Sequence, residues 1–318
     1  MKMPLVSVLI SSYNAEKYIE EAISSALRQT YLNIEVIVID AGSTDRTSQL
    51  VRALNDRRIR FMQHAYEPIK VTRNALLKEA KGDFLTFLDS DDIYLAEKVE
   101  EEVKFLEQHS EYAAVYCDLR YFFDGDPERL YRHRYTFYSG DIFPQLLEKM
   151  FITNTTLMFR RAVVEKIGGY DERLGMVEDW DYFLRMAHAG FHFGFLPKDL
   201  VRYRLRWDNH TRFGNQVPIQ ESAVKIFENL KLHMTSDERE RYEIDRHIAK
   251  RKERLVVALL AAGKKKIAWV LLGECRTAMR TTRLLLVVFL FVIPSVLLRF
   301  VIERAWKWKK RNLFVPVH

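Results

Sequence analysis

Phe84-Leu85-Thr86-Phe87-Leu88-Asp89-Ser90-Asp91-Asp92 joins an apolar run to three carboxylates within four residues. The apolar residues predict a buried central strand that carries the acids to the edge of a sheet. In open α/β sheets ligands bind beyond the carboxyl ends of the strands, and hard divalent cations prefer oxygen ligands. The stretch therefore predicts a site for a metal ion and a phosphate group.

Short apolar runs alternate with helical patterns on both sides of this stretch. We expect strands at residues 5–10, 34–39, 59–63 and 113–117, and helices at about 18–27, 45–54, 71–80 and 95–109. This alternation predicts right-handed crossovers and a mostly parallel α/β sheet. Asn14 is placed to cap the first helix, and Asp45 to cap the second.

The second half of the chain is less regular. Residues 121–139 have no clean period and are expected to form loops and short edge strands. A strand at 155–159, helices at 162–167 and 180–189, and strands at 191–196 and 200–205 follow. Residues 217–282 predict three helices, with breaks at Thr235, where a capping box with Glu238 is expected, and at Gly263. The predicted domains are therefore 1–216, a helical appendix at 217–283, and a tail at 284–318.

The net charge of +7 is concentrated in the tail. Nine Lys and Arg residues but one acid lie between Arg276 and His318. Residues 284–298 are apolar apart from Pro294 and Ser295. This run is shorter than the ~20 apolar residues that a membrane span needs. We therefore expect an interfacial or re-entrant helix on an anionic membrane surface rather than binding to nucleic acid. A core helix packed on the body is the alternative.

The two cysteines, Cys117 and Cys275, lie far apart in the sequence and have no metal-binding spacing. They favour a reducing compartment over a disulfide framework or a zinc site. The first residues lack the pattern of a secretion signal. We expect a cytoplasmic protein, peripheral or monotopic on the inner face of the cell membrane.

Several motifs, in this order, resemble those of family 2 glycosyltransferases, which have the GT-A fold. They lie at residues 6–14, 25–31, 35–45, 80–92, 168–172 and 178–181, so the resemblance covers about residues 4–206. It implies a GT-A domain, a Rossmann-like α/β fold, that transfers a sugar from a nucleotide-diphospho-sugar to a glycan or lipid-linked acceptor. The transfer would invert the configuration of the anomeric carbon.

The resemblance assigns Asp89 and Asp91 to a DXD motif that holds Mn²⁺ or Mg²⁺, with Asp91 as the more direct ligand. His210, in a polar loop after the last strand, is a further candidate metal ligand. A bound cation would stabilise the charge that develops on the leaving diphosphate. The alternative is that the acids only cap the following helix, although one cap needs only one acid.

The same resemblance places the nucleotide across the first strands. Asp40 is expected to receive a donor from the base or ribose, and the Tyr13 ring to supply an apolar face. Many relatives have a second acid where this chain has Ala41, which leaves the identity of the base open. Arg73 either approaches the donor or is a solvated arginine on a helix face. The residues assigned to the nucleotide-sugar are Ser11, Tyr13, Asp40, Arg73, Asp89 and Ser90.

Inverting transfer needs one general base that accepts the proton of the acceptor hydroxyl. Glu178 and Asp179 match the acidic pair of the family, and Asp179 is the predicted base. An acid at this position could also cap the helix that follows. Trp180 either stacks on an acceptor sugar or belongs to the core.

Two other functions are alternatives to sugar transfer. A nucleotidyltransferase that makes nucleotide-sugars prefers a Gly-rich loop after the first strand, and residues 11–14 contain no glycine. A non-catalytic scaffold with the same fold would not need carboxylates at both predicted sites. Sugar transfer is therefore the preferred interpretation.

Overall fold

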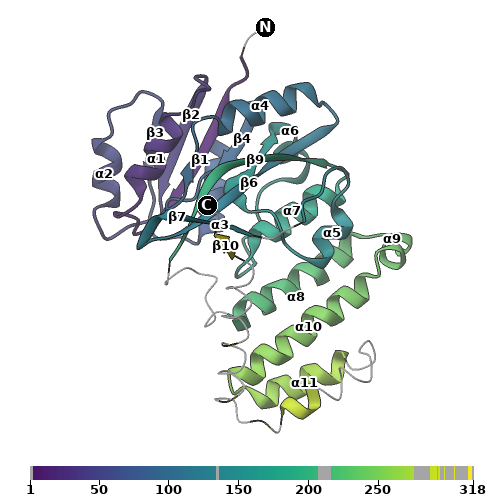
Figure 1. Cartoon of the computed structure of the whole chain (residues 1–318). Helices are drawn as coiled ribbons and strands as arrows, with labels where there is room; N and C mark the ends of the chain where they lie inside the picture. Colours follow the sequence, from purple (N-terminus) through teal and green to yellow (C-terminus); the bar gives the residue numbers. More distant parts are fainter. Residues whose placement is uncertain are drawn as a thin grey trace. The chain divides into compact units, whose positions relative to one another are not determined.

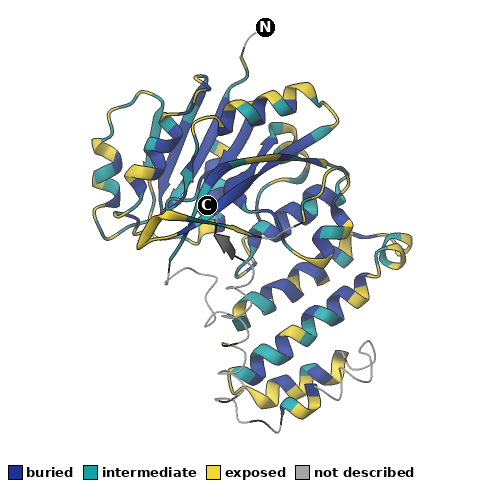
Figure 2. Ribbon diagram, viewed as in Figure 1, coloured by how far each residue is buried: buried dark blue, intermediate teal, exposed yellow. Residues whose placement is uncertain are grey.

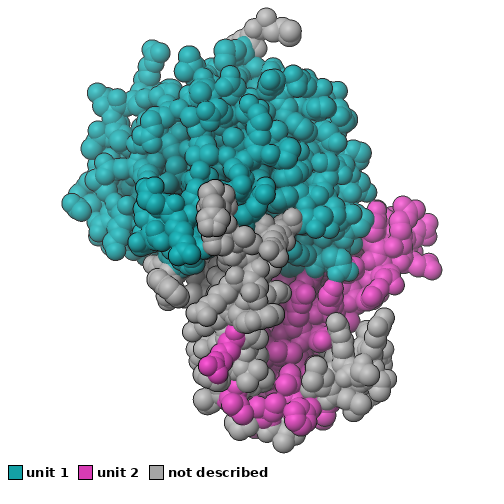
Figure 3. All heavy atoms as spheres, in the orientation of Figure 1, with its two compact units in different colours: residues 1–172, 179–206, 316–318 teal, residues 173–178, 207–315 magenta. Residues whose placement is uncertain are grey.

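The computed structural model describes residues 3–133, 136–206, 216–275, 287–291, 293, 297, 304 and 314–316. The chain divides into two compact units, coloured separately in Figure 3. Unit 1 contains Met1–Glu172, Asp179–Arg206 and Pro316–His318, and unit 2 contains Arg173–Glu178 and Trp207–Val315. Most of the predicted tail lies outside the described residues.

The first half of unit 1 has the predicted alternation of strands and helices (Figure 1). The four strands are parallel and lie in the order β4-β1-β2-β3. They are β1 (Val6–Ser12), β2 (Ile34–Asp40), β3 (Ile59–Gln63) and β4 (Phe84–Phe87). The helices between them are α1 (Ile19–Leu27), α2 (Thr47–Ala53) and α3 (Ile69–Glu79).

The second half extends the sheet with antiparallel pairs. β8 (Leu157–Arg160) lies between β4 and β6 (Tyr112–Phe123) and is antiparallel to both. A hairpin of β6 with β7 (Asp126–His133) occupies part of the stretch expected to form loops and edge strands. The remaining elements are β5 (Ile93–Tyr94), α4 (Lys98–Gln108), α5 (Phe143–Glu148), η1 (Asn154–Thr156), α6 (Arg161–Ile167) and α7 (Glu178–His188).

The two strands expected at 191–196 and 200–205 are one strand, β9 (His192–Leu205), parallel to β6. The prediction of a break was wrong. β9 stays paired with β6, and the register between the two strands shifts where the break was expected. Cys117 pairs with Leu196, but the next residue, Asp118, pairs with Asp199. Such bulges keep a strand continuous while re-aiming its side chains.

The core of unit 1 is built around β1, β2 and β4, which are mostly dark blue in Figure 2. Val8, Ile10 and Val38 are fully buried, and Ile23 of α1 packs in the same cluster. Each such aliphatic side chain contributes about 1.5–3 kcal/mol through burial. The strong burial of β1, β2 and β4 explains why their sequences are almost continuously apolar.

Unit 2 contains α8 (Gln216–His233), α9 (Ser236–Arg241), α10 (Ile244–Ala261) and α11 (Lys265–Cys275). The predicted breaks occur, and the capping box between Thr235 and Glu238 is confirmed. One further break lies at Glu243, whose φ is +46°. A short strand, β10, is Phe314–Pro316. Within the described part of the chain, no helix is both long and apolar enough to cross a membrane.

Candidate functional site

The carboxyl ends of the parallel strands bring several of the predicted nucleotide and metal residues to one edge of the sheet. The register pairs Ser12 of β1 with Asp40 of β2, and Leu9 of β1 with Phe87 of β4. Ser11 therefore lies near the ends of these strands, and Asp89 and Ser90 follow β4 directly. This is the edge at which open α/β sheets bind ligands.

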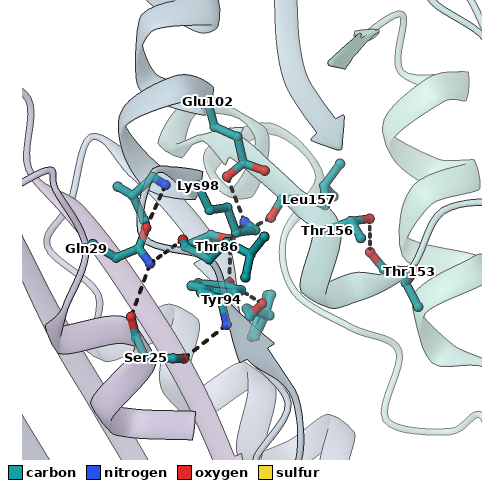
Figure 4. A network of polar contacts seen from close by, with 12 residues as sticks. Ser25, Gln29, Thr86, Tyr94, Lys98, Glu102, Thr153, Thr156 and Leu157 are labelled. Atoms are coloured by element: carbon teal, nitrogen blue, oxygen red, sulfur yellow. Dashed lines mark hydrogen bonds and ion pairs between the residues drawn. The ribbon is translucent and has the colours of Figure 1, made fainter. Parts of the chain in front are cut away.

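A buried polar network anchors the end of β4 (Figure 4). The Tyr94 hydroxyl donates to the Phe87 carbonyl at 2.6 Å, and the Lys98 ammonium donates to the Thr86 hydroxyl at 3.1 Å. Lys98 also donates to Glu102 at 2.7 Å, and both side chains are fully buried. Burial raises the pKa of Glu102 to about 7, and the attraction of Lys98 opposes that rise. This network was not predicted from the sequence, where its signal is a Lys and a Glu four residues apart on one helix.

Asp89 pairs with Arg73 of α3. The Arg73 Nη2 lies 3.2 Å from Asp89 Oδ1, and the guanidinium carbon lies 5.8 Å from the Phe87 ring centre and 5.6 Å from that of Tyr170. Arg73 is buried, so the alternative of a solvated arginine on a helix face is wrong. Asn74 holds Tyr170 in place by accepting from its amide at 2.7 Å and donating to its carbonyl at 3.0 Å.

Asp91 lies between a positive and a negative neighbour, Arg206 and Asp89. Its carboxylate pairs with Arg206 at 3.1 Å. Burial and the repulsion of Asp89 raise the pKa of Asp91 to about 6, although Arg206 opposes the shift. The side chains of Asp89 and Asp91 stay 29% and 19% exposed, so both remain accessible to a ligand.

Asp92 differs from the two acids before it because it is buried and bonded on both oxygens. It accepts from the Thr155 hydroxyl at 2.9 Å and from the Arg204 amide at 2.9 Å. Burial and the repulsion of Asp91 raise its pKa well above the ordinary value. Asp92 therefore ties the loop after β4 to β9 and η1. The alternative that the acids only cap a helix is wrong, because α4 begins later, after Glu97, and has no side-chain cap.

The chemistry of Asp89 and Asp91 fits a Mg²⁺ or Mn²⁺ ion. Such a hard cation is often held by one or two protein carboxylates together with substrate phosphates and water. A cation would also relieve the repulsion that raises the pKa of Asp91. Within the described ranges, no cluster of three or more His, Cys, Asp or Glu side chains is arranged to hold a metal. His210 lies outside the described residues.

Asp40 is fully buried at the end of β2. Its carboxylate accepts from the Ser43 amide at 3.3 Å and from the hydroxyls of Ser43 and Ser48. These bonds shape the loop between β2 and α2. Tyr13 is exposed, and its ring meets that of Tyr66 edge-on at 5.1 Å. The two rings form an aromatic surface beside the strand ends.

Asn14 does not cap the first helix, which begins at Ile19 without a side-chain cap. Its side chain instead accepts from the Thr44 amide at 2.9 Å, so it ties the loop after β1 to the loop after β2. Asp45 accepts from the amide of Thr47, the first residue of α2, at 2.9 Å. Asp45 thus supports the start of its helix, but from two positions upstream.

The start of α7 presents Asp179. Its carboxylate is partly exposed and accepts from the Trp180 amide at 2.9 Å, and Glu178 beside it is buried. The Trp180 indole is buried and donates to the Leu146 carbonyl of α5 at 2.9 Å. Trp180 is therefore a core residue, and the hypothesis that it stacks on an acceptor sugar is wrong. Its bond to α5 fixes the position of Asp179.

A hollow of about 410 Å³ lies beside α5. Tyr138 is exposed at its edge, and the Phe151 ring meets it edge-on at 5.3 Å. The Tyr138 carbonyl accepts from the Tyr116 hydroxyl, and the Tyr138 amide donates to the same hydroxyl. These two bonds hold Tyr138 in place at the edge of the hollow. The sequence has no readable motif for this feature. The lining residues are Thr136, Tyr138, Pro144, Gln145, Glu148, Lys149 and Phe151.

Comparison with known protein families shows to which family the chain belongs. The family described as Glycosyl transferase family 2 matches residues 7–168, about half of the chain. The chain belongs to glycosyl transferase family 2. An uncharacterized glycosyltransferase of Rickettsia bellii is 30% identical over 228 residues, which is 70% of this chain and 31% of that protein.

A second relative of this family 2 protein is WfgD of Escherichia coli, named a UDP-Glc:alpha-D-GlcNAc-diphosphoundecaprenol beta-1,3-glucosyltransferase. It is 44% identical over 103 residues, which is 32% of this chain and 41% of WfgD. The matched part of the chain thus spans less than half the length of either curated relative.

Solved structures confirm the predicted GT-A-type α/β fold. TarS residues 1–349 of S. aureus, in complex with UDP-GlcNAc, has a TM-score of 0.65 and 21% identity, covering 87% of this chain and 82% of TarS. The mannosyltransferase PcManGT of Pyrobaculum calidifontis, in complex with GDP-Man and Mn²⁺, has a TM-score of 0.60 and 18% identity. That match covers 94% of this chain and 88% of PcManGT.

Proposed function

We propose that this family 2 protein transfers a sugar from a nucleotide-diphospho-sugar to a glycan or lipid-linked acceptor and inverts the anomeric carbon. The observation that carries the proposal is the pair of accessible carboxylates, Asp89 and Asp91, at the carboxyl edge of the parallel strands. The reactions named for WfgD support a lipid diphosphate acceptor. Such an acceptor and the basic, apolar sequence of the tail support a location on the inner face of the cell membrane.

Asp89 and Asp91 would hold a Mg²⁺ or Mn²⁺ ion, which when bound supplies Lewis-acid stabilisation of the leaving diphosphate. Arg73 adds a fixed positive charge beside Asp89. Because its guanidinium lies against the rings of Phe87 and Tyr170, it needs little rearrangement when charge develops nearby.

Asp179 is the proposed general base. It removes the proton of the acceptor hydroxyl as the oxygen attacks the anomeric carbon on the face opposite the diphosphate. The new glycosidic C–O bond forms while the bond to the diphosphate breaks, and its electron pair leaves with the nucleoside diphosphate. The Trp180 amide holds one oxygen of Asp179, and the bond of the Trp180 indole to α5 keeps this helix start in place.

The hollow beside α5 is the proposed site for a sugar of the acceptor. Aromatic faces and hydrogen-bonding side chains together suit a sugar ring, which has apolar faces and polar edges. The hollow is linked to the proposed base because Gln145 in its wall precedes Leu146, the partner of the Trp180 indole. Tyr138→Ala is expected to raise the acceptor KM several-fold and leave the donor KM unchanged. Phe123→Ala, at an exposed ring outside the hollow, is the control; an unchanged acceptor KM in Tyr138→Ala refutes this assignment.

Mass spectrometry of reactions with UDP-Glc, UDP-GlcNAc or GDP-Man and a diphosphoundecaprenol-linked GlcNAc tests the transfer. Asp179→Asn is expected to lower kcat by about 10²–10⁴-fold, the usual contribution of a general base, with donor binding retained in calorimetry. Asp237→Asn, at an exposed acid of α9, is the matched control. Turnover by Asp179→Asn equal to that of the wild type would exclude this base. Absence of metal-dependent transfer with every donor would overturn the function.

A further inference from the structure

Unit 2 has an exposed apolar surface on α11 and on the helical residues 287–290. Ile267, Trp269 and Val270 are 57%, 61% and 67% exposed, and Val288 and Phe289 are exposed as well. We call these five residues the α11 surface. Figure 2 shows exposed residues, in yellow, along α11.

The opposite face of α11 already supplies the contacts that hold the helix in unit 2. Ala268 and Leu272 are buried and pack in one cluster with Val256 and Leu259 of α10. The exposed parts of the α11 surface are therefore apolar area in addition to the contacts that hold α11 in unit 2. Single exposed apolar residues are ordinary on soluble proteins, but a contiguous group of large ones marks an interaction site.

Basic residues lie at the start of the same helix. Lys264, Lys265 and Lys266 are consecutive and exposed, and Glu274 is the only acid within α11. The Lys265 ammonium donates to the Phe291 carbonyl at 2.8 Å, and the Trp269 ring meets the Phe291 ring edge-on at 5.2 Å. These contacts join α11 to the segment that carries Val288 and Phe289. Indole, aliphatic and ammonium groups in one surface match the headgroup region of a bilayer.

We propose that the α11 surface binds the interface of an anionic phospholipid bilayer. Ile267, Trp269 and Val270 enter the boundary between headgroups and acyl chains, and the three lysines contact anionic headgroups. The helix then lies along the membrane instead of crossing it. The proposal goes beyond the transfer reaction and is carried by exposed residues of α11 together with Val288 and Phe289, not by the basic charge of the tail.

Sedimentation of the full chain with lipid vesicles tests the proposal. We expect binding to vesicles that contain phosphatidylglycerol, weaker binding to pure phosphatidylcholine, and a loss of affinity as salt screens the lysines. The triple variant Ile267→Ser, Trp269→Ser and Val270→Ser is expected to lose at least tenfold in vesicle affinity. Leu232→Ser, at a 75% exposed residue of α8 outside the surface, is the matched control and should bind like the wild type.

The charge of the surface is tested separately. Replacing Lys264, Lys265 and Lys266 by Gln should remove the preference for phosphatidylglycerol. Circular dichroism and thermal unfolding establish that the variants fold. Turnover of a water-soluble acceptor should be unchanged in them, which separates failure of this proposal from failure of the transfer reaction.

Three results would overturn the proposal. The first is a wild-type chain that does not sediment with phosphatidylglycerol vesicles. The second is a serine triple variant that binds vesicles as well as the wild type does, which would assign membrane binding to another segment. The third is a wild-type dimer that the serine variant converts to a monomer without any vesicle binding, which would make the α11 surface a contact between two copies of the chain.

Discussion

Removing one partner of the buried pair between Lys98 and Glu102 should destabilise unit 1 strongly. Both side chains are fully buried, and their charged atoms lie 2.7 Å apart. Lys98→Met leaves the Glu102 carboxyl in the core without a cation, and Glu102→Gln leaves the buried ammonium beside a neutral amide instead of a carboxylate. Breaking a buried pair in this way costs about 3–5 kcal/mol of unfolding free energy.

The double variant separates pairing from packing. Lys98→Met combined with Glu102→Gln leaves no buried charge, so we expect it to be less destabilised than either single variant. Urea unfolding of the four proteins at neutral pH, followed by far-ultraviolet circular dichroism, measures the three differences. Destabilisation of the double variant equal to the sum of the single effects would refute the coupling.

The pair also predicts how stability depends on pH. The pKa of Glu102 is about 7 in the folded chain, above its ordinary value of 4.5, so the folded state holds a proton that the unfolded state releases first. The contribution of Glu102 is therefore fully present below pH 4.5 and is lost as the pH rises through about 7. The wild type should lose stability relative to Glu102→Gln between about pH 5 and pH 8. A constant difference across this range would contradict the assignment.

Two further substitutions test the support of the site. Arg73→Lys keeps the charge but loses the planar group that stacks on two rings, so we expect a several-fold higher donor KM in steady-state kinetics, with circular dichroism showing that the variant folds. An unchanged KM would exclude a donor role. Gly169→Ala places a Cβ 2.3 Å from the Asn74 Oδ1 and should lower the melting temperature by several degrees. Gly273→Ala, a helical glycine with open space around it, is the control and should be neutral or stabilising; equal melting temperatures for the two variants would refute the predicted clash.

Local patterns predicted the parts of the fold that depend on neighbours in sequence. The apolar run of β4, the alternation of strands and helices, and the capping box at Thr235 and Glu238 were all correct, because the partners lie within one element or one turn. The prediction that Asn14 caps the first helix was wrong, because its side chain accepts from the Thr44 amide, thirty residues away. A cap residue offers a hydrogen-bond acceptor, but the sequence does not say which backbone amide donates to it.

The three acids after β4 show the same limit at the candidate site. The sequence predicts a carboxylate cluster at a strand end, but it treats Asp89, Asp91 and Asp92 alike. Their partners decide how they differ, and these lie far along the chain: Arg73 for Asp89, Arg206 for Asp91, and Thr155 with the Arg204 amide for Asp92. Asp92 has both oxygens committed to the fold, whereas Asp89 and Asp91 lie at a partly exposed edge and form side-chain ion pairs with Arg73 and Arg206. Because a cation or a phosphate can replace such ion pairs more readily than buried bonds to the backbone, the first two acids can bind a ligand while the third keeps the loop in place.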